Sequence, residues 1–390
     1  MAASQNGHAD VVKQLIASGV NVMSTNLSGN NALIAASAKG FIDIVQQLLF
    51  SGIDVNQRTH DHGVSAVMAA CHNGHVEIVK QLIISGADIA TVAYSGGDAL
   101  IAASTAGHAY IVRLLLAAGA DVINKDNDGY SALLYASSNG HFDTVNYLLE
   151  FDADVAARNK DGYSALLLAS RNGYTNVVKL LLDSGADITI KNNMNFNSLA
   201  LASAYGYVET IKLLLEYYKL NLIDKNDDGV NALMAAGQNG HSDVVTELLQ
   251  SGVDPSTINN NGASVLMYAS LMGHIETVSL LLKFNASLIS IIDYNGRNAL
   301  MCASQSGYGE VVAELLLNGA NARTKDNEGV TALMLASENG HVDVVKKLLD
   351  SGAEILVKTK KGQNALMLAS LKGRTDVVKQ LLEFGTDSST

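Results

Sequence analysis

The stretch ENGHVDVVKKLLDSGAEI, residues 338–355, decides the fold, because close copies of it recur along the whole chain. One copy, SNGHFDTVNYLLEFDADV, occupies residues 138–155. The first glycine of the phrase recurs every 33 or 34 residues, which indicates a repeat protein rather than two or three globular domains. It falls at positions 7, 40, 74, 107, 140, 173, 206, 240, 273, 307, 340 and 373.

Two further positions keep a fixed distance from this glycine. A second glycine follows twelve residues later, with Asp152, Tyr218 and Asn285 in its place in three copies and Gly385 in the last. We expect Asp152 and Asn285 to adopt the left-handed conformation, which Tyr218 tolerates poorly. A third landmark, Gly or Asn195, lies eleven residues before the first. One-residue insertions therefore fall only between the second glycine and the third landmark of the next copy, after residues 52, 218 and 285. This predicts rigid helices in the two fixed intervals and a surface loop in the variable one.

Each fixed interval has the pattern of a helix. The first begins two residues after the third landmark with a residue that can cap a helix N-terminus, and A-L-x-x-A-S follows in most copies. The second opens in most copies with an acidic residue, which suits the positive end of a helix dipole, and carries apolar pairs such as Val344, Val345, Leu348 and Leu349. The variable interval is rich in Asn, Asp and Gly and predicts a hairpin finger. The capping residues are Asn31, Ser65, Asp98, Ser131, Ser164, Asn197, Asn231, Ser264, Asn298, Thr331 and Asn364.

This pattern resembles the ankyrin repeat along essentially the entire chain, about twelve times. The resemblance implies an all-α, gently curved solenoid of helix-turn-helix units joined by β-hairpin fingers. The usual T-P-L-H opening is altered, since Ala, Ser or Val stands at the proline position and Met, Leu, Ile or Ala at the histidine position. Proline at the first helical position is dispensable. The missing histidine puts the family's usual hydrogen bond between repeats in doubt, but not the fold.

We expect one array over residues 1–390. Its approximate repeats are 1–25 (partial), 26–59, 60–92, 93–125, 126–158, 159–191, 192–225, 226–258, 259–292, 293–325, 326–358 and 359–390. The first repeat starts inside its first helix and lacks the capping residue, whereas arrays normally end in polar caps. The sequence leaves open whether the chain is a piece of a longer protein.

Charge, cysteine content and the N-terminal sequence limit the classes of binding partner and the cellular compartment that we expect. The formal net charge of -12 opposes phosphate backbones and anionic lipids, so we expect neither nucleic acid binding nor membrane insertion. Cys71 and Cys302 lie seven repeats apart and cannot pair. The N-terminus has no signal peptide pattern, and a cytoplasmic or nuclear protein is the expectation. We also expect a monomer.

The ten histidines are the residues that could most readily form a metal site or an acid–base site. Seven of the ten follow the first glycine, at a position that also accepts Phe41 and Arg374, so we assign them to packing or capping. His60, His62 and His72 all belong to the third repeat and are weak candidate zinc ligands together with Asp61. No P-loop, dinucleotide fingerprint or nucleophile elbow occurs, and we expect no cofactor.

Asn56 lies in a context that resembles the asparagine hydroxylation site of ankyrin fingers, although a plain turn residue is the simpler interpretation.

The resemblance implies that partners dock on the fingertips and on the exposed side of the first helices. Just after the finger landmark, three consecutive copies carry Tyr130, Tyr163 and Phe196. At the usual spacing of packed helices these would form an aromatic row about 20 Å long, flanked by Arg171 and Tyr205. Aromatic and arginine side chains are typical of binding hot spots, although the rings could also merely cover neighbouring fingers.

Three functional interpretations follow. The first is a non-enzymatic scaffold or adaptor that binds a partner protein or peptide on its concave finger and first-helix surface. The second is the regulatory or targeting arm of a larger multidomain enzyme or channel. The third is a metal-dependent protein that uses His60, His62 and His72.

Overall fold

The computed structural model describes residues 1–217 and 224–387, so Tyr218 and the insertion after it lie outside the described residues. The chain divides into two compact units, Met1–Asn193 and Met194–Thr390, and each is described by itself. The described residues form 24 α-helices and one 3-10 helix. Among them, no helix has the length and apolar character needed to cross a bilayer.

The helices come in pairs, one pair for each repeat. In the first unit they are α1 (Ala2–Gln5), α2 (Ala9–Ala17), α3 (Ala32–Lys39), α4 (Ile42–Phe50), α5 (Ala66–His72), α6 (Val76–Ile84), α7 (Ala99–Ala106), α8 (Ala109–Ala117), α9 (Ala132–Ser138), α10 (Phe142–Glu150), α11 (Ala165–Arg171) and α12 (Thr175–Asp183). In the second unit they are α13 (Ser198–Tyr205), α14 (Val208–Tyr217), α15 (Ala232–Gln238), α16 (Ser242–Gln250), α17 (Val265–Met272), α18 (Ile275–Phe284), η1 (Ala286–Ser290), α19 (Ala299–Ser306), α20 (Gly309–Leu317), α21 (Ala332–Asn339), α22 (Val342–Asp350), α23 (Ala365–Leu371) and α24 (Thr375–Asp387).

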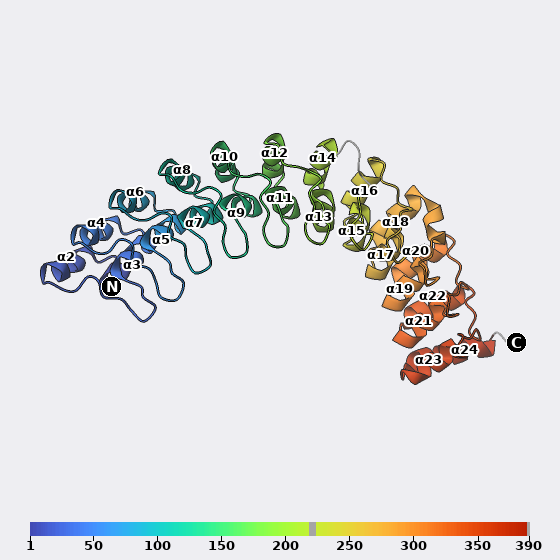
Figure 1. The fold of residues 1–390 in the computed structure, drawn as a ribbon. Helices are drawn as coiled ribbons and strands as arrows, with labels where there is room; N and C mark the ends of the chain where they lie inside the picture. The colour runs from blue at the N-terminus through green and yellow to red at the C-terminus, as the bar shows by residue number, and fades with distance from the viewer. Residues whose placement is uncertain (218–223, 388–390) are drawn as a thin grey trace. The chain divides into compact units, whose positions relative to one another are not determined.

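Within each unit the helices stack in two rows. The first helices of neighbouring repeats contact one another, as α5 contacts α7 and α19 contacts α21, and the second helices form a parallel row (Figure 1). The two helices of one repeat also contact each other, as α5 contacts α6. In the first unit the finger loops extend from the row of first helices. The predicted helical repeat architecture is therefore confirmed.

The predicted capping residues all cap the first helices. In each of the eleven repeats that has one, the side-chain oxygen accepts a hydrogen bond from the backbone N–H three residues later, as Asn31 does from Ile34 at 2.8 Å. This bond satisfies a backbone donor that the helix itself leaves unpaired. The caps thus fix where every first helix begins.

The core is built mainly from the first helices. Leu133 and Ala136 of α9 are each no more than 1% exposed, and the small alanine lets neighbouring helices approach closely. A second helix buries one face only, as α22 does with Val344, Val345 and Leu348. Fully packed side chains of this kind each contribute about 1.5–3 kcal/mol to folding.

The fingers contain less β-structure than predicted. The described fingers hold no continuous strand, and five of them show a single antiparallel bridge, such as Arg58 with Ser65.

The landmark glycines take positive φ angles, and Asp152 (φ 59°) and Asn195 (φ 58°) do so in their places. Asn285 was wrongly predicted to be left-handed: its φ is −150°, and its side chain caps η1, which accommodates the inserted residue. Gly385 lies inside α24 rather than at a turn, because the last helix continues to Asp387.

Two departures from the repeat pattern compensate each other. Gly237 in α15 stands where most copies have Ser, and Val265 at the start of α17 stands where most copies have Ala. A Cβ atom built on Gly237 would overlap the Cγ2 methyl of Val265, which is 1% exposed. The larger residue in one repeat is therefore accommodated by the smaller residue in the repeat before it.

This packing predicts a strongly coupled pair of substitutions. Gly237→Ser alone should destabilise the protein by about 1–3 kcal/mol through overpacking, and Val265→Ala alone by a similar amount through a cavity, about 1–3 kcal/mol. The double variant restores the sequence of the other repeats and should regain most of the loss. Urea unfolding of all four proteins measures the coupling energy, and purely additive effects would contradict the compensation.

Asp98 is the one ionisable residue among the eleven caps. Its Oδ1 accepts from the Ile101 amide at 2.8 Å and its Oδ2 from the Asn124 Nδ2 at 2.8 Å, and the residue is only 5% exposed. Burial raises the pKa of Asp98, although these hydrogen bonds act in the opposite direction. The folded protein therefore holds the Asp98 proton more tightly than the unfolded chain does.

A test follows from the sign of this shift. With the folded pKa above the unfolded one, the contribution of Asp98 to stability falls as the pH rises through the folded pKa. Asp98→Asn keeps a capping oxygen and removes the charge. The free energy of unfolding of this variant, relative to that of the wild type, should therefore increase as the pH is raised from 3 to 7. Asp98→Ala also removes the charge and is the matched control: it should lie about 1 kcal/mol below Asp98→Asn at both pH values because the cap is gone. A constant difference between Asp98→Asn and the wild type would disprove the assignment.

Candidate functional site

Backbone hydrogen bonds join the fingertips within each unit. The N–H of one fingertip donates to the carbonyl oxygen of the fingertip before it, as Asn127 does to Ser95 at 2.7 Å and Lys160 to Asp128 at 3.0 Å. In the second unit Asn260 donates to Asp228 at 2.9 Å in the same way. These bonds pair backbone groups that no regular sheet or helix would satisfy, and they hold each fingertip against its neighbour.

Asn and Asp side chains reinforce this ladder. Asn127 Nδ2 donates to the Tyr94 carbonyl at 2.8 Å, and Asn327 repeats the bond to Tyr294 at 2.9 Å. Within one finger, Asp126 Oδ1 accepts from the amides of Asp128 and Tyr130 at 3.0 and 2.8 Å. The Asn-Asp-Gly richness of the fingers is therefore a hydrogen-bond network that orders the surface.

Tyr130, predicted as a partner contact, is half-buried on the finger side of the first unit. Its ring stacks on that of Tyr135 in α9, with 4.8 Å between centroids. The Tyr135 hydroxyl donates to Asp126 Oδ2 at 2.6 Å, and burial together with this hydrogen bond raises the pKa of Tyr135. The aromatic pair is thus held between a finger and a first helix.

Tyr163 and Arg171, also predicted contacts, form a second pair in the first unit. The guanidinium carbon of Arg171, the last residue of α11, lies 5.6 Å from the centroid of the Tyr163 ring. A cation over an aromatic face at this distance is attracted by the ring quadrupole. The sequence placed these residues near each other, and the structure pairs them.

Phe196 and Tyr205, the remaining predicted contacts, belong to the second unit. Phe196 is half-buried and lines a hollow with Asn226, Gln238 and Tyr268, while Tyr205 is 48% exposed and stacks on Tyr207 at 6.5 Å. The hollow is rich in side-chain amides, which both donate and accept hydrogen bonds.

A hollow in the first unit was not predicted. It lies between the fingers and the first helices of the third and fourth repeats and is lined mainly by apolar residues, including Val64, Met68 and Ile101. Gly97 and Ala102 stand there at positions filled by Tyr130 and Tyr135 in the next repeat. Comparing equivalent positions between repeats would have revealed this loss of side-chain volume.

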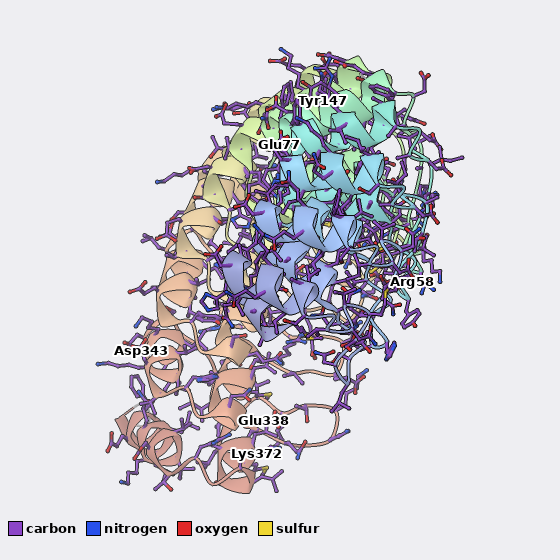
Figure 2. All side chains as sticks on the ribbon, turned by 90° about the vertical axis from the view of Figure 1, so that its left-hand side faces the viewer. Arg58, Glu77, Tyr147, Glu338, Asp343 and Lys372 are labelled. Carbon is purple, nitrogen blue, oxygen red and sulfur yellow. The ribbon has the colours of Figure 1, made fainter. Side chains whose placement is uncertain are left out.

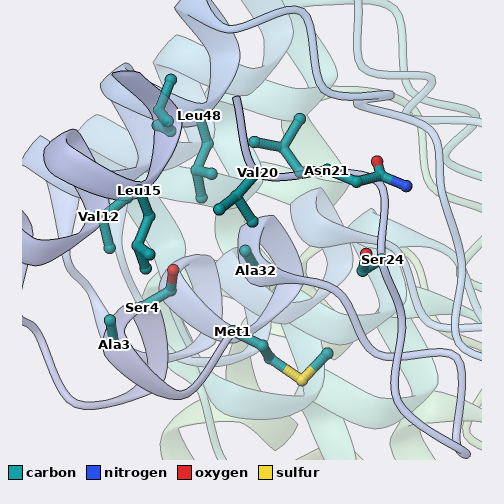
Figure 3. Close-up of a pocket in the computed structure, with 12 residues that line it drawn as sticks. Met1, Ala3, Ser4, Val12, Leu15, Val20, Asn21, Ser24, Ala32 and Leu48 are labelled. Carbon is teal, nitrogen blue, oxygen red and sulfur yellow. The ribbon is translucent and has the colours of Figure 1, made fainter. Parts of the chain in front are cut away.

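A further hollow lies at the start of the first unit (Figure 3). Its lining includes Leu15 and Val20 from α2 and the loop after it, Ala32 from α3 and Leu48 from α4. Its lining is mainly apolar, with Ser4, Asn21 and Ser24 as polar members.

The second helices of the first unit carry two cation–π pairs. Lys80 Nζ lies 5.5 Å from the centroid of Tyr110, and the Arg113 guanidinium carbon lies 5.6 Å from that of Tyr147. Figure 2 shows Tyr147 and Glu77 on the second helices and Arg58 among the finger loops. Aromatic and basic side chains therefore occur on both surfaces, but the hollow between repeats 3 and 4 lies on the finger side.

The repeated histidines connect neighbouring repeats. The Nε2 atom of His141 lies 3.1 Å from the Thr105 carbonyl oxygen of the preceding repeat, and that of His274 lies 3.0 Å from the Gln238 carbonyl oxygen. Arg374 fills the same position and donates from Nε to the Glu338 carbonyl at 3.0 Å. Side chains at this position also cover the first glycine of the preceding repeat. A Cβ atom built on Gly40, for example, would lie 2.6 Å from the His75 ring. These residues supply a hydrogen bond between repeats at the start of the second helix, away from the altered T-P-L-H opening.

The candidate metal ligands are not gathered together. No three His, Cys, Asp or Glu side chains in the described part of the chain form a group that could hold a metal ion. His60 packs beside Gly29, His62 pairs with Asp61 at 4.0 Å, and the exposed His72 lines the hollow of the first unit. The metal-dependent interpretation gains no support from their positions.

Asn56, the candidate for modification, is exposed and bridges two repeats. Its Oδ1 accepts from the Asp88 amide at 2.8 Å, and its Nδ2 donates to the Gly86 carbonyl at 3.4 Å. The side chain therefore has a structural role, because it joins the loop after α4 to the loop after α6.

Cys71 and Cys302 are both free and buried. Burial raises the pKa of both thiols, that of Cys302 to about 11. A protonated, buried thiol is a poor nucleophile and a poor metal ligand. They occupy core positions of α5 and α19.

The comparison with protein families agrees with this architecture. A family model described as ankyrin repeats in three copies matches residues 1–93, 68–159, 99–192, 191–259, 233–326 and 308–390, which together span the chain. No curated protein matches the chain in a sequence comparison. Ankyrin repeats are generally protein–protein interaction modules, and the family is typically non-enzymatic. The chain belongs to the ankyrin-repeat family.

Proposed function

We propose that this protein is a non-enzymatic scaffold or adaptor that binds a partner protein or peptide on its finger and first-helix surface. The observation that carries the proposal is the order of that surface: fingertips joined by backbone hydrogen bonds present Tyr130, Tyr163 and Arg171 already paired. Side chains that are ordered before binding lose less conformational entropy when a partner docks.

The proposed contacts in the first unit are Tyr130, Tyr163 and Arg171, and those in the second unit are Phe196 and Tyr205. Aromatic and arginine residues provide most of the energy at typical protein interfaces. Tyr130, Tyr163 and Phe196 are half-buried, so a partner would cover rings that already have packing neighbours rather than flexible side chains.

The charge of the chain supports a protein partner. A formal net charge of -12 repels phosphate backbones and anionic membranes, because such partners require clustered Lys and Arg. The proposal places the protein as a monomer in the cytoplasm or nucleus, where two free thiols are compatible with the reducing environment.

The test begins with affinity capture of the full chain and mass spectrometry to identify the partner. The triple variant Tyr130→Ala, Tyr163→Ala, Phe196→Ala should then weaken the measured Kd more than about tenfold, because three hot-spot side chains are removed. Isothermal titration calorimetry measures the affinity, and urea unfolding checks that the triple variant remains folded.

The matched control is Tyr110→Ala with Tyr147→Ala, which removes rings from the second helices of the same unit. It should leave the Kd within about twofold of the wild type, because rim and off-site contacts contribute little. An unchanged Kd for the folded triple variant would refute the proposed surface.

A further inference from the structure

The hollow of the first unit exists because two side chains are missing. At the positions of Gly97 and Ala102, the next repeat carries Tyr130 and Tyr135, whose rings stack on each other. A Cβ atom built on Gly97 would meet nothing closer than the Ile101 Cγ2 at 3.6 Å, and Gly97 has no positive φ that would require glycine. The backbone conformation at position 97 therefore does not require glycine, and the effect of Gly97 is to leave the hollow open.

Most of the lining is apolar, but one wall carries a carboxylate. Met68, Ala69, Ile101 and Ala102 provide the apolar surface, and Asp98 is the acidic residue among the lining side chains, which also include His72. In the other ten capped repeats this position holds a neutral Asn, Ser or Thr. The space left by Gly97 and the charge of Asp98 thus occur side by side in one repeat.

The carboxylate decides what kind of side chain fits. Asp98 is only 5% exposed, so its carboxylate is largely desolvated before any partner binds. An apolar occupant would remove the remaining water without replacing it, which is costly for an ionised group. A cation on an alkyl stem would cover the apolar walls with its stem and supply the opposite charge to Asp98.

Other polar groups at the hollow also accept hydrogen bonds. Asn73 donates its Nδ2 to the Ala69 carbonyl at 2.8 Å, which leaves its Oδ1 as an acceptor, and the exposed Ser95 contributes a hydroxyl. An ammonium group has three donors and a guanidinium has five, so either can use Asp98 together with these neighbours.

The fingertips around the hollow have the complementary charge. Residues 60–62, 93–95 and 126–128 include Asp61, Asp126 and Asp128 and contain neither Lys nor Arg. The nearby Arg58 is directed to the next finger, where its Nη1 donates to the Val92 carbonyl at 2.9 Å and its guanidinium lies 5.9 Å from the Tyr94 centroid. The local field therefore favours a cation at this place.

We infer that this hollow is a subsite for one lysine or arginine side chain of the partner, with its stem against Met68 and Ile101 and its charged head at Asp98. The inference rests on the proposed function only for the identity of the molecule that carries this side chain. It specifies what the partner must present: a basic residue that inserts beside the aromatic pair of Tyr130 and Tyr135.

The test uses a small probe and needs no partner. n-Butylammonium is titrated into the full chain labelled with 13C at Met and Ile methyl groups, and n-butanol serves as the uncharged analogue of similar shape. Met68 and Ile101 should report saturable shifts with n-butylammonium at a Kd on the order of 1–10 mM, as five non-hydrogen atoms allow. The n-butanol Kd should be at least about tenfold weaker, since it lacks the charge.

Two variants make the result specific. Asp98→Asn keeps the helix cap and should reduce n-butylammonium binding to the level of n-butanol, whereas Gly97→Val fills the hollow and should abolish both. Valine occupies the Gly97 position in three other repeats, as Val64, Val230 and Val330, so the fold tolerates it. Ala263→Val places the same valine side chain at the equivalent position of the second unit and should leave the titration unchanged.

Equal affinity for n-butanol and n-butylammonium, or full binding by folded Asp98→Asn, would overturn the inference. An absence of saturable shifts in the wild type would overturn it too. These outcomes leave the proposed function intact if the triple aromatic variant still loses its partner. Conversely, a partner unaffected by that variant would refute the proposed surface while the probe titration stands.

Discussion

Close packing between neighbouring first helices is the constraint on which the rest of the structure depends. Small residues such as Ala136 let α7, α9 and α11 approach, and each repeat buries its apolar face against the repeats beside it. The requirement is local, so a change in one repeat must be compensated in the next, as Gly237 and Val265 show. The glycines beneath the histidine, tyrosine and arginine side chains of the following repeat obey the same constraint.

This packing leaves the finger side free to vary. The backbone of each finger is held by bonds to its neighbour, such as that from Lys160 to Asp128, and by Asx turns such as that of Asp126. Side chains that follow the landmark glycines therefore change from Gly97 to Tyr130 without disturbing the scaffold. In the first unit this side carries an aromatic pair, a cation–π pair and a mainly apolar hollow with a buried carboxylate.

The sequence predicted most of the scaffold because the repeats report the same geometry many times. Every predicted cap forms its hydrogen bond, since the position is set by local backbone chemistry. It failed at Asn285 and Gly385, where a 3-10 helix and an extended last helix replace the expected turn. The sequence also did not reveal that the repeated histidines join neighbouring repeats, because the bond from His141 to Thr105 links residues 36 positions apart.

The sequence by itself determined the repeat length, the helix starts, the loops that absorb insertions and the side of the chain that carries the variable residues. These follow from periodicity and from interactions within a few residues. Only the tertiary structure decided that Tyr130 stacks on Tyr135, that Arg171 covers Tyr163, and that Gly97, Met68 and Asp98 line one hollow. Such contacts join a finger to a first helix or one repeat to the next, and their geometry depends on side-chain packing that no single segment encodes.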